Sequence, residues 1–308
     1  MAPDTPECHA AYDRAREIFY THFTYLFAEQ GGPIHREEVP YEGGVLPCWR
    51  VLPDGASKGA ILFHGGNDSL LEEFTDALLY LAQGGYTVLA FEGPGQGAAL
   101  RKSGLTFTPE WEKPVGAVLD HYGAEDVTII GVSLGGELCM RAAAMEPRIR
   151  RVVSWSVLPS IYGALMADKP AEIRAKLEHW LDENNRDAIL DLYAGLAERE
   201  PLFRWSIQHS NYAYGTSDVY EYLQKARAFT IEPVAERITQ DVLLLSARED
   251  LLVDFALYKQ EIDLLKNTRS LEFAAPGRAL NGQAHCNMGN TKYMLDLILN
   301  WNDRMLER

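Results

Sequence analysis

The sequence is poor in cysteine. Four of its 308 residues are cysteines, and no two of them form a Cys-x-x-Cys pair. This argues against a disulfide framework and against a zinc site, and it favours a reducing cytosol. No window approaches the unbroken apolar length of a membrane span. Residues 1–10 contain two acids and no apolar core, unlike a signal peptide. We therefore expect a cytoplasmic protein with no membrane partner.

Positive charge is also scarce, since 29 lysines and arginines stand against 44 acids and leave a net charge of −15. Nucleic acid and anionic membranes would repel such a chain, so neither is an expected partner. The glycine-rich residues 92–97 lack the lysine and the hydroxyl residue of a P-loop, and they lack Gly-x-Gly-x-x-Gly. We interpret them as a tight loop pinned by Glu92, and we expect neither a cofactor nor a metal.

The sequence does contain a nucleophile signature at residues 126–137. A short run rich in β-branched residues leads into Gly-x-Ser-x-Gly, and a helix-favouring run follows at once. Strand, tight turn and helix in this order are the context of a nucleophile elbow. Such an elbow strains Ser133 and holds its hydroxyl exposed at the carboxyl end of a sheet. Gly131 and Gly135 would let strand and helix approach, because they lack Cβ atoms. An incidental turn serine is the alternative.

A serine that attacks a carbonyl needs N–H groups preset around the oxygen that becomes negative, each worth about 3 kcal/mol. One donor should be the N–H of Leu134, which directly follows the nucleophile. The second should come from the loop after an earlier apolar strand, with Gly66 as the first choice and Asn67 as the second. A plain turn is the alternative role of the Gly65-Gly66 pair. We expect His64 to bond the loop backbone and not to act as the base.

Two further side chains complete the predicted site. Asp250 follows the buried strand at residues 241–247, where a carboxylate could orient a histidine and stabilise its charged form. Glu249 and Asp254 are its nearby rivals. His285 is the only histidine downstream of Asp250. The chain order is then serine, aspartate and histidine, which is the order that accompanies a nucleophile elbow.

The hydrophobic pattern divides the chain into a core of residues 1–157 and 238–308 and an inserted helical lid of residues 158–237. Residues 8–30 have the spacing of an amphipathic helix that packs on the core or on the lid. A homodimer face is the alternative for this helix. An antiparallel hairpin at the edge of an otherwise parallel sheet is expected from two runs, residues 34–41 and 46–52.

The lid is crowded with aromatic residues, and we expect most of them to form its own core. A break that contains Gly215 indicates an irregular segment. Aromatic residues near this break are better placed to line a substrate pocket. The candidates for substrate binding are therefore Trp205, Tyr212 and Tyr214.

The elbow, the His-Gly-Gly loop, Asp250 and His285 together resemble the α/β-hydrolase fold over nearly the whole chain. The implied architecture is a mostly parallel central sheet with helices on both faces and a helical lid. Residues 91–97, 211–215 and 285–290 resemble a narrower group, which contains 2,6-dihydroxypseudooxynicotine hydrolase and fungal hydrolases that shorten polyketides for pigment synthesis. This resemblance implies serine-dependent cleavage of a carbon–carbon bond next to a carbonyl.

The chain is shorter at its N-terminus than we expect of that group, and the lid is the group's most variable part. The group's dimer and substrates therefore do not carry over. The expected function is that of a serine hydrolase acting on a small aromatic or polyketide-like molecule. A carboxylesterase or thioesterase of the same fold is one rival, and a non-hydrolytic cyclase or binding protein is another.

Overall fold

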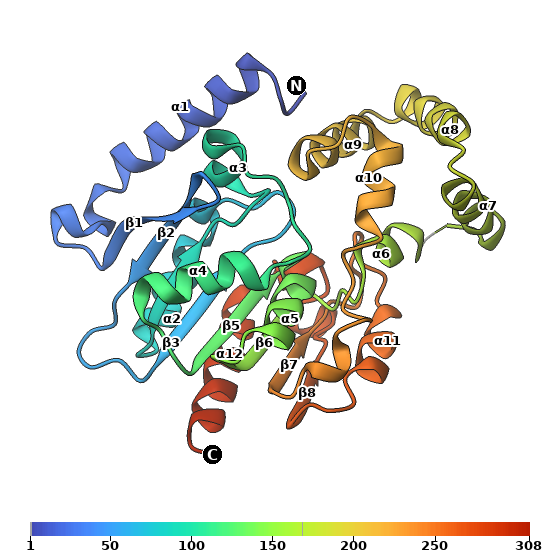
Figure 1. Cartoon of the computed structure of the whole chain (residues 1–308). Coiled ribbons are helices and arrows are strands. Elements are labelled where there is room, and N and C mark those ends of the chain that lie inside the picture. The colour runs from blue at the N-terminus through green and yellow to red at the C-terminus, as the bar shows by residue number, and fades with distance from the viewer. Residues whose placement is uncertain (1, 168) are drawn as a thin grey trace.

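Within the residues that the structure describes, 2–167 and 169–308 of a computed structural model, one eight-stranded sheet forms the centre (Figure 1). Its strands are β1 (Ile34–Tyr41), β2 (Gly44–Val51), β3 (Ala60–His64), β4 (Thr87–Phe91), β5 (Val127–Val132), β6 (Ile149–Trp155), β7 (Asp241–Leu245) and β8 (Ser270–Ala274). The strand order is β1-β2-β4-β3-β5-β6-β7-β8. β2 is antiparallel to β1 and to β4, and the remaining neighbours are parallel.

The hairpin expected at the edge of the sheet is confirmed. β1 and β2 pair along their whole length as far as Tyr41 and Gly44. Glu42 and Gly43 between them have φ values of 43° and 80°. Two positive φ values in a two-residue turn match the right-handed twist of the paired strands. The mostly parallel sheet with an antiparallel edge is therefore the observed architecture.

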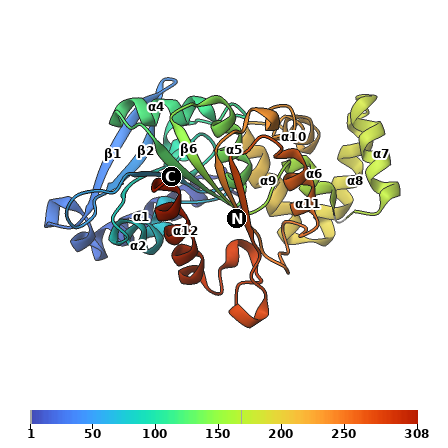
Figure 2. The same ribbon diagram turned by 90° about the horizontal axis from the view of Figure 1, so that it is seen from below.

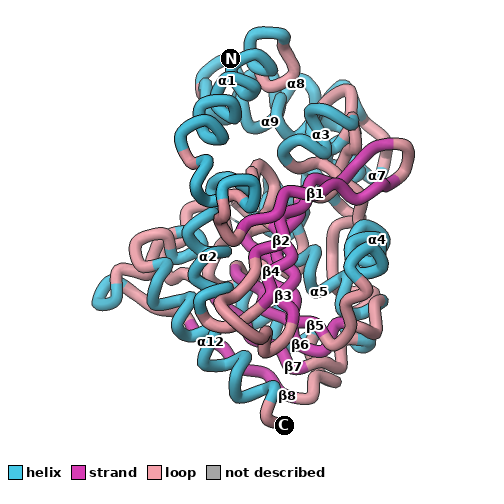
Figure 3. Tube along the Cα trace, turned by 90° about the vertical axis from the view of Figure 1, so that its left-hand side faces the viewer, coloured by secondary structure: helices cyan, strands magenta, loops and turns pink. Residues whose placement is uncertain are grey.

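Helices cover both faces of the sheet. In the core they are α2 (Thr75–Gln83), α3 (Gly97–Ser103), α4 (Glu112–Tyr122), α5 (Gly135–Met145), α11 (Leu257–Leu264) and α12 (Thr291–Leu306). Figure 3 shows α2 and α12 on one side of the sheet and α4 on the other. Leu78 and Ile298 belong to the apolar cluster on the first face, and Leu119 and Leu138 belong to the cluster on the second. β5 is buried at every position because both of its faces are covered.

The N-terminal helix is shorter than predicted. α1 covers Pro6–His22, whereas the apolar spacing predicted a helix over residues 8–30. Phe27 is 3% exposed, and its ring centroid lies 5.6 Å from that of Trp49. The chain leaves the helix and places Phe27 in the core, so tertiary packing overrides the helical pattern. The 3-10 turns of the described residues are η1 (Thr24–Leu26), η2 (Ala28–Gln30), η3 (Leu71–Phe74), η4 (Ala235–Arg237), η5 (Arg278–Leu280) and η6 (His285–Asn287).

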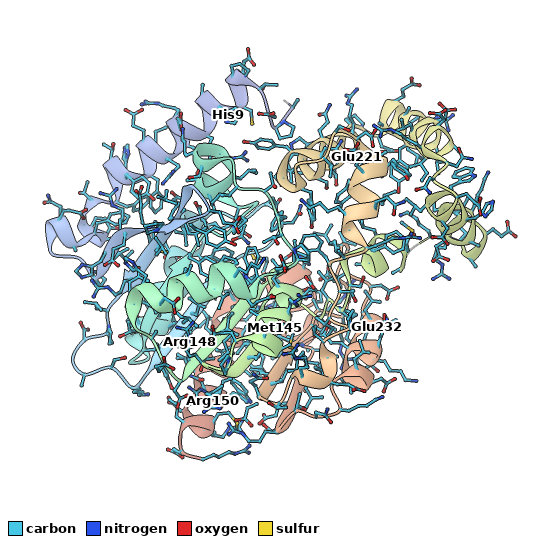
Figure 4. All side chains as sticks on the ribbon, in the orientation of Figure 1. His9, Met145, Arg148, Arg150, Glu221 and Glu232 are labelled. Atoms are coloured by element: carbon cyan, nitrogen blue, oxygen red, sulfur yellow. The ribbon has the colours of Figure 1, made fainter. Side chains whose placement is uncertain are left out.

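The segment predicted to be a lid, residues 158–237, lies between β6 and β7 and projects to one side of the sheet (Figures 1 and 2). Its helices are α6 (Ile161–Ala167), α7 (Ala171–Asp182), α8 (Arg186–Arg199), α9 (Pro201–Tyr214) and α10 (Val219–Ala226). α9 reaches back toward the N-terminal helix. Figure 4 labels His9 on α1. The ring centroid of His9 lies 5.9 Å from that of Tyr212 on α9.

Candidate active site

Ser133 follows β5 in a tight turn that leads into α5. Its φ is 60°, a left-handed conformation that costs a non-glycine residue free energy. A Cβ atom on Gly131 would lie 1.9 Å from the carbonyl oxygen of Gly135. Only glycine therefore lets the strand and the helix come this close. The strand, the turn and the helix expected around the serine are all present.

Two side chains far from Ser133 in the sequence meet it at this turn. Oγ of Ser133 lies 2.9 Å from Nε2 of His285, and Nδ1 of the same ring lies 2.7 Å from Oδ2 of Asp250. Asp250 follows β7, and His285 lies between β8 and α12. The structure thus brings the three predicted residues into one hydrogen-bonded chain, with the imidazole between the hydroxyl and the carboxylate.

The two rival carboxylates face other groups. Glu249 accepts hydrogen bonds from the Arg278 guanidinium with both of its oxygens, at 2.7 Å each. Asp254 accepts a hydrogen bond from the backbone N–H of Ala256 at 2.8 Å. Among the described residues, only Asp250 places a carboxylate against His285.

Asp250 is suited to stay ionised. Its side chain is 3% exposed, and this burial by itself would raise its pKa. Hydrogen bonds from His285 and from the N–H groups of Leu252 and Val253 outweigh burial and lower the pKa. For His285, burial would lower the pKa, but the hydrogen bond to Asp250 opposes it and the pKa is raised. The pair therefore favours the charged form of the imidazole.

The loop that carries His285 is held in place by Asn287, which is 1% exposed. Its Nδ2 donates to the carbonyl oxygens of Ser246 at 3.0 Å and Gly282 at 2.6 Å. Its Oδ1 accepts from Nε1 of Trp155 at 3.1 Å. Asn287 thereby ties the histidine loop to the ends of β6 and β7. Sequence reasoning assigned no separate role to Asn287, although it lies within residues 285–290, one of the segments that carry the family resemblance.

The two N–H groups expected to bind the oxyanion differ: that of Leu134 has no hydrogen-bond acceptor in the described chain, whereas that of Gly66 already donates a hydrogen bond. The N–H of Leu134 has no acceptor among the described residues. Gly66 packs against the nucleophile, since a Cβ atom on it would lie 2.8 Å from the Cβ of Ser133. However, the N–H of Gly66 donates to Oγ of Ser69 at 2.8 Å, while the N–H of Asn67 has no acceptor in the described chain. The geometry therefore favours Asn67, the second choice from the sequence, over Gly66.

The glycine-rich segment after β4 supports this loop. Gln96 is 1% exposed, and its Nε2 donates to the carbonyl oxygens of Gly65 at 2.8 Å and Gly66 at 3.0 Å. Its Oε1 accepts from the N–H of Gly93 at 2.9 Å. Glu92 pins the segment as predicted, because it accepts from two backbone N–H groups at 3.1 and 2.6 Å. Burial raises the pKa of Glu92 to about 7. Sequence reasoning assigned no role to Gln96, although it lies within residues 91–97, one of the segments that carry the family resemblance.

His64 has the structural role that was expected. Its ring is fully buried. Nδ1 lies 3.1 Å from the carbonyl oxygen of Gly65, and Nε2 accepts from Nε1 of Trp111 at 3.2 Å. Burial lowers the pKa of His64 to about 4, so the ring stays neutral. It therefore holds the loop and is not placed to act as the base for Ser133.

The three residues proposed to line a substrate pocket differ in accessibility. Trp205 is 38% exposed, and Tyr212 is partly buried. Tyr214 is 0% exposed, and its ring centroid lies 4.9 Å from that of Phe107. The expected break is present: α9 ends at Tyr214, Gly215 closes it in the left-handed conformation, and residues 215–218 are irregular. Tyr214 therefore packs in an aromatic cluster with Phe107, Tyr222 and Phe229.

Three further observations concern the described residues only. The four cysteines, Cys8, Cys48, Cys139 and Cys286, are all free thiols. No group of three or more histidine, cysteine, aspartate or glutamate side chains is arranged to hold a metal ion within residues 2–167 and 169–308. In the same part of the chain, every helix is too short or too polar to cross a membrane.

Sequence comparison identifies the family. A profile described as the α/β-hydrolase fold matches residues 61–281. The α/β hydrolase psoB of Aspergillus fumigatus is 32% identical over 217 residues, which cover 63% of this chain and 48% of psoB. Hydrolase ORFZ of Pyricularia oryzae is 29% identical over 288 residues, which cover 83% of this chain and 65% of ORFZ. The chain thus spans about half to two thirds of the length of these relatives.

Comparison with solved structures gives the same fold. The crystal structure of 2,6-dihydroxy-pseudo-oxynicotine hydrolase has a TM-score of 0.71 and 20% identity, with 96% of this chain and 75% of that chain covered. A thermostable carboxyl esterase from Bacillus coagulans has a TM-score of 0.60 and 12% identity, and the match covers 89% of this chain and 99% of the esterase. At these identities the likeness shows the fold. The predicted resemblance to this hydrolase and to fungal hydrolases is confirmed. The chain therefore belongs to the α/β-hydrolase fold family.

Proposed function

We propose that this chain is a serine hydrolase in which Ser133 is the nucleophile, His285 the general base and Asp250 the carboxylate that orients it. The observation that carries this proposal is the hydrogen-bonded chain, with 2.9 Å between the serine Oγ and Nε2 and 2.7 Å between Nδ1 and the carboxylate. Both distances are within hydrogen-bond reach of a nucleophile and its base. The lowered pKa of Asp250 supports the same role, because an ionised carboxylate stabilises the imidazolium.

The first half of the reaction forms an acyl-enzyme. Nε2 of His285 takes the proton of Ser133 as Oγ attacks the carbonyl carbon of the substrate. The carbonyl oxygen becomes negative and accepts hydrogen bonds from the N–H groups of Leu134 and Asn67. When the carbonyl reforms, the bond to the leaving group breaks and its electron pair stays on the leaving atom. His285 then returns its proton to that atom.

The second half releases the acid. His285 takes a proton from a water molecule, and the hydroxyl oxygen attacks the acyl carbon of the ester on Ser133. The second tetrahedral intermediate uses the same N–H donors. Its collapse frees the carboxylic acid, and the proton on His285 returns to Oγ of the serine. Every proton transfer in the cycle therefore passes through Nε2 of one histidine.

The proposed substrate is a small aromatic or polyketide-like molecule, cleaved at a carbon–carbon bond next to a carbonyl. In that case the leaving atom is a carbon whose electron pair a neighbouring carbonyl or ring delocalises. The resemblance to 2,6-dihydroxy-pseudo-oxynicotine hydrolase and the fungal hydrolases among the relatives support this choice. The aromatic residues of the lid agree with a flat substrate, and Trp205 on α9 is a partly exposed candidate for contact with it.

Labelling with a fluorophosphonate probe tests the nucleophile. We expect one adduct, located at Ser133 by mass spectrometry, and no adduct in the variant Ser133→Ala, which should fold like the original protein. An unlabelled Ser133 in the original protein would remove the enzyme interpretation and leave a cyclase or a binding protein on the same scaffold.

Parallel assays distinguish the leaving groups. Hydrolysis of aryl esters and thioesters is compared with cleavage of acylphloroglucinol-type ketones, using the original protein and Ser133→Ala for each substrate. Ketone cleavage that depends on Ser133 supports the carbon–carbon assignment. Turnover of esters alone would make this chain a carboxylesterase or a thioesterase, with the same serine, histidine and aspartate.

A further inference from the structure

Three consecutive carbonyl oxygens in the loop after β3 are held by side chains. The oxygens of Gly65 and Gly66 accept hydrogen bonds from Nε2 of Gln96, at 2.8 and 3.0 Å. The oxygen of Asn67 lies 3.2 Å from Nε2 of His209. Gln96 comes from the core, at the start of α3, whereas His209 comes from α9 in the lid. The loop is therefore held from the core and from the lid at once.

The bond from Gln96 to the Gly66 carbonyl sets the direction of the Asn67 N–H, and the bond from His209 holds the next peptide group. A trans peptide group is planar, so an N–H points opposite to the carbonyl of the residue before it. The carbonyl of Gly66 points at Gln96, and the N–H of Asn67 therefore points away from Gln96. The peptide group on the other side of Asn67 is held by His209. Neither backbone dihedral of Asn67 can change far without breaking one of these bonds.

His209 is buried and stacked, and its hydrogen bond to Asn67 is its polar contact with the core. Its side chain is 3% exposed, and its ring stacks on that of Trp205 with centroids 5.2 Å apart and planes 12° from parallel. Nε2 carries the proton, because its partner is a carbonyl oxygen. The other ring nitrogen, Nδ1, is buried without a partner in the described part of the chain. The one hydrogen bond that the ring makes in this part of the chain therefore joins α9 to the loop after β3.

A neutral His209 ring suits the hydrogen bond to the Asn67 carbonyl oxygen. Burial lowers the pKa of His209, so the ring is neutral at neutral pH and keeps the tautomer with the proton on Nε2. Asp68 and Arg101 lie near enough to act on the ring with opposite signs, the first raising its pKa and the second lowering it. Neither charge therefore converts His209 into a cation that would alter the loop.

We propose that His209 is a positioning residue for the oxyanion hole, through which the lid aims the Asn67 N–H at the oxygen that becomes negative when Ser133 attacks. This inference rests on the proposed function, because it assigns His209 a part in the same site. In this proposal the lid, through His209, also holds the loop that carries the oxyanion donor. Displacing α9 from the core would separate His209 from Asn67 and leave the donor less well aimed.

Phosphonylation of Ser133 by a fluorophosphonate measures this role without a known substrate, because the phosphoryl oxygen of the probe takes the place of the carbonyl oxygen. His209→Phe keeps an aromatic ring against Trp205 but cannot donate. His209→Gln can donate from its side-chain amide but lacks the ring. His179→Phe, at an exposed position of α7, is the matched control. The thermal unfolding of each variant is measured alongside.

We expect Ser133 in folded His209→Phe to be labelled roughly ten-fold more slowly than in the original protein. His209→Gln should recover most of the rate, and His179→Phe should match the original protein. His209→Leu replaces the phenylalanine variant in this comparison if the latter does not fold. Equal rates for the original protein and the variant without a donor would overturn the inference and leave the proposed function intact. Equal slowing in His209→Gln would also overturn it, because packing of the ring would then be the cause. An unlabelled original protein would overturn the proposed function itself.

Discussion

A Cβ atom on Gly66 would come within 2.8 Å of the Cβ of Ser133 and within 2.8 Å of the carbonyl oxygen of Val132. The loop after β3 and the turn after β5 therefore touch at the nucleophile, with no room for a side chain between them. Both contacting groups belong to backbone or to the first side-chain atom, which cannot rotate away. The distance between Ser133 and the loop that holds the proposed second oxyanion donor is thus set by a missing Cβ atom.

The first prediction concerns this contact. In Gly66→Ala the added methyl group pushes the loop away from Ser133, and we expect kcat/KM to fall roughly 100-fold, the effect of displacing a reacting group by about 1 Å. Overpacking should also lower the free energy of unfolding by about 1–3 kcal/mol. Steady-state kinetics and chemical unfolding measure the two effects.

Gly195→Ala is the matched control for this substitution. Gly195 lies on an exposed turn of α8, and a Cβ atom there would meet nothing within 4 Å. Alanine at this position should raise the free energy of unfolding by about 0.5–1 kcal/mol and leave kinetics unchanged. Comparable activity of Gly66→Ala and Gly195→Ala would show that the contact at the nucleophile has no part in catalysis.

Asp250→Asn should lower kcat roughly 10⁴-fold with little change in KM, because the amide neither fixes the correct tautomer of His285 nor stabilises its charged form. Glu249→Gln is the matched comparison. It should change kcat less than about two-fold, since Glu249 faces Arg278 at an exposed position and such pairs contribute little. A large loss of kcat in Glu249→Gln with activity retained in Asp250→Asn would reassign the carboxylate.

The pH dependence of kcat/KM should show the raised pKa of His285. The ring acts as a base only when neutral, so activity is lost as the pH falls and the ring gains its proton. Burial alone would move this pKa down, but the hydrogen bond to Asp250 raises it. We therefore expect the midpoint of the acidic limb to lie above 6.5, the ordinary pKa of histidine. A series of rates from pH 5 to pH 10 measures it, and a midpoint below 6.5 would contradict the assignment.

Stability should fall as the pH rises, because of two buried carboxyl groups. Burial raises the pKa of Glu137 on α5 and of Glu261 on α11 to about 8, whereas both are near 4.5 in an unfolded chain. Between these values the folded protein keeps protons that the unfolded chain has released. The stabilisation is complete below pH 4.5 and is lost as the pH rises through 8.

Glu137→Gln tests this account. The variant should have a flatter dependence of melting temperature on pH between 5 and 9 than the original protein, and it should melt higher at pH 9. Glu198→Gln, at an exposed position of α8, is the control and should follow the original curve. Parallel curves for the original protein and Glu137→Gln would mean that this carboxyl group does not titrate in the window.

Features that depend on neighbours in the chain could be predicted from the sequence. The strand, the turn and the helix around Ser133 follow from six buried strand residues, two glycines and a helix-favouring run. The turn at Gly43 follows from the residue types that accept positive φ. The family follows from the same motifs together with the order of Asp250 and His285, since that order is a property of the chain.

Features that depend on where distant segments meet could not be predicted in this way. The end of α1 depends on how Phe27 packs against Trp49. The choice between Gly66 and Asn67 as a donor depends on the position of Ser69 Oγ. Such contacts are decided by side-chain geometry that no local pattern carries.

The sequence by itself therefore determined the type of fold and singled out the serine, aspartate and histidine proposed for the site, because local backbone preference and chain order encode them. Only the tertiary structure decided which amides are free and which residues support them. His209 and Asn67 are 142 residues apart, and their contact exists because the packing of α9 against the core brings an imidazole N–H to a single carbonyl oxygen.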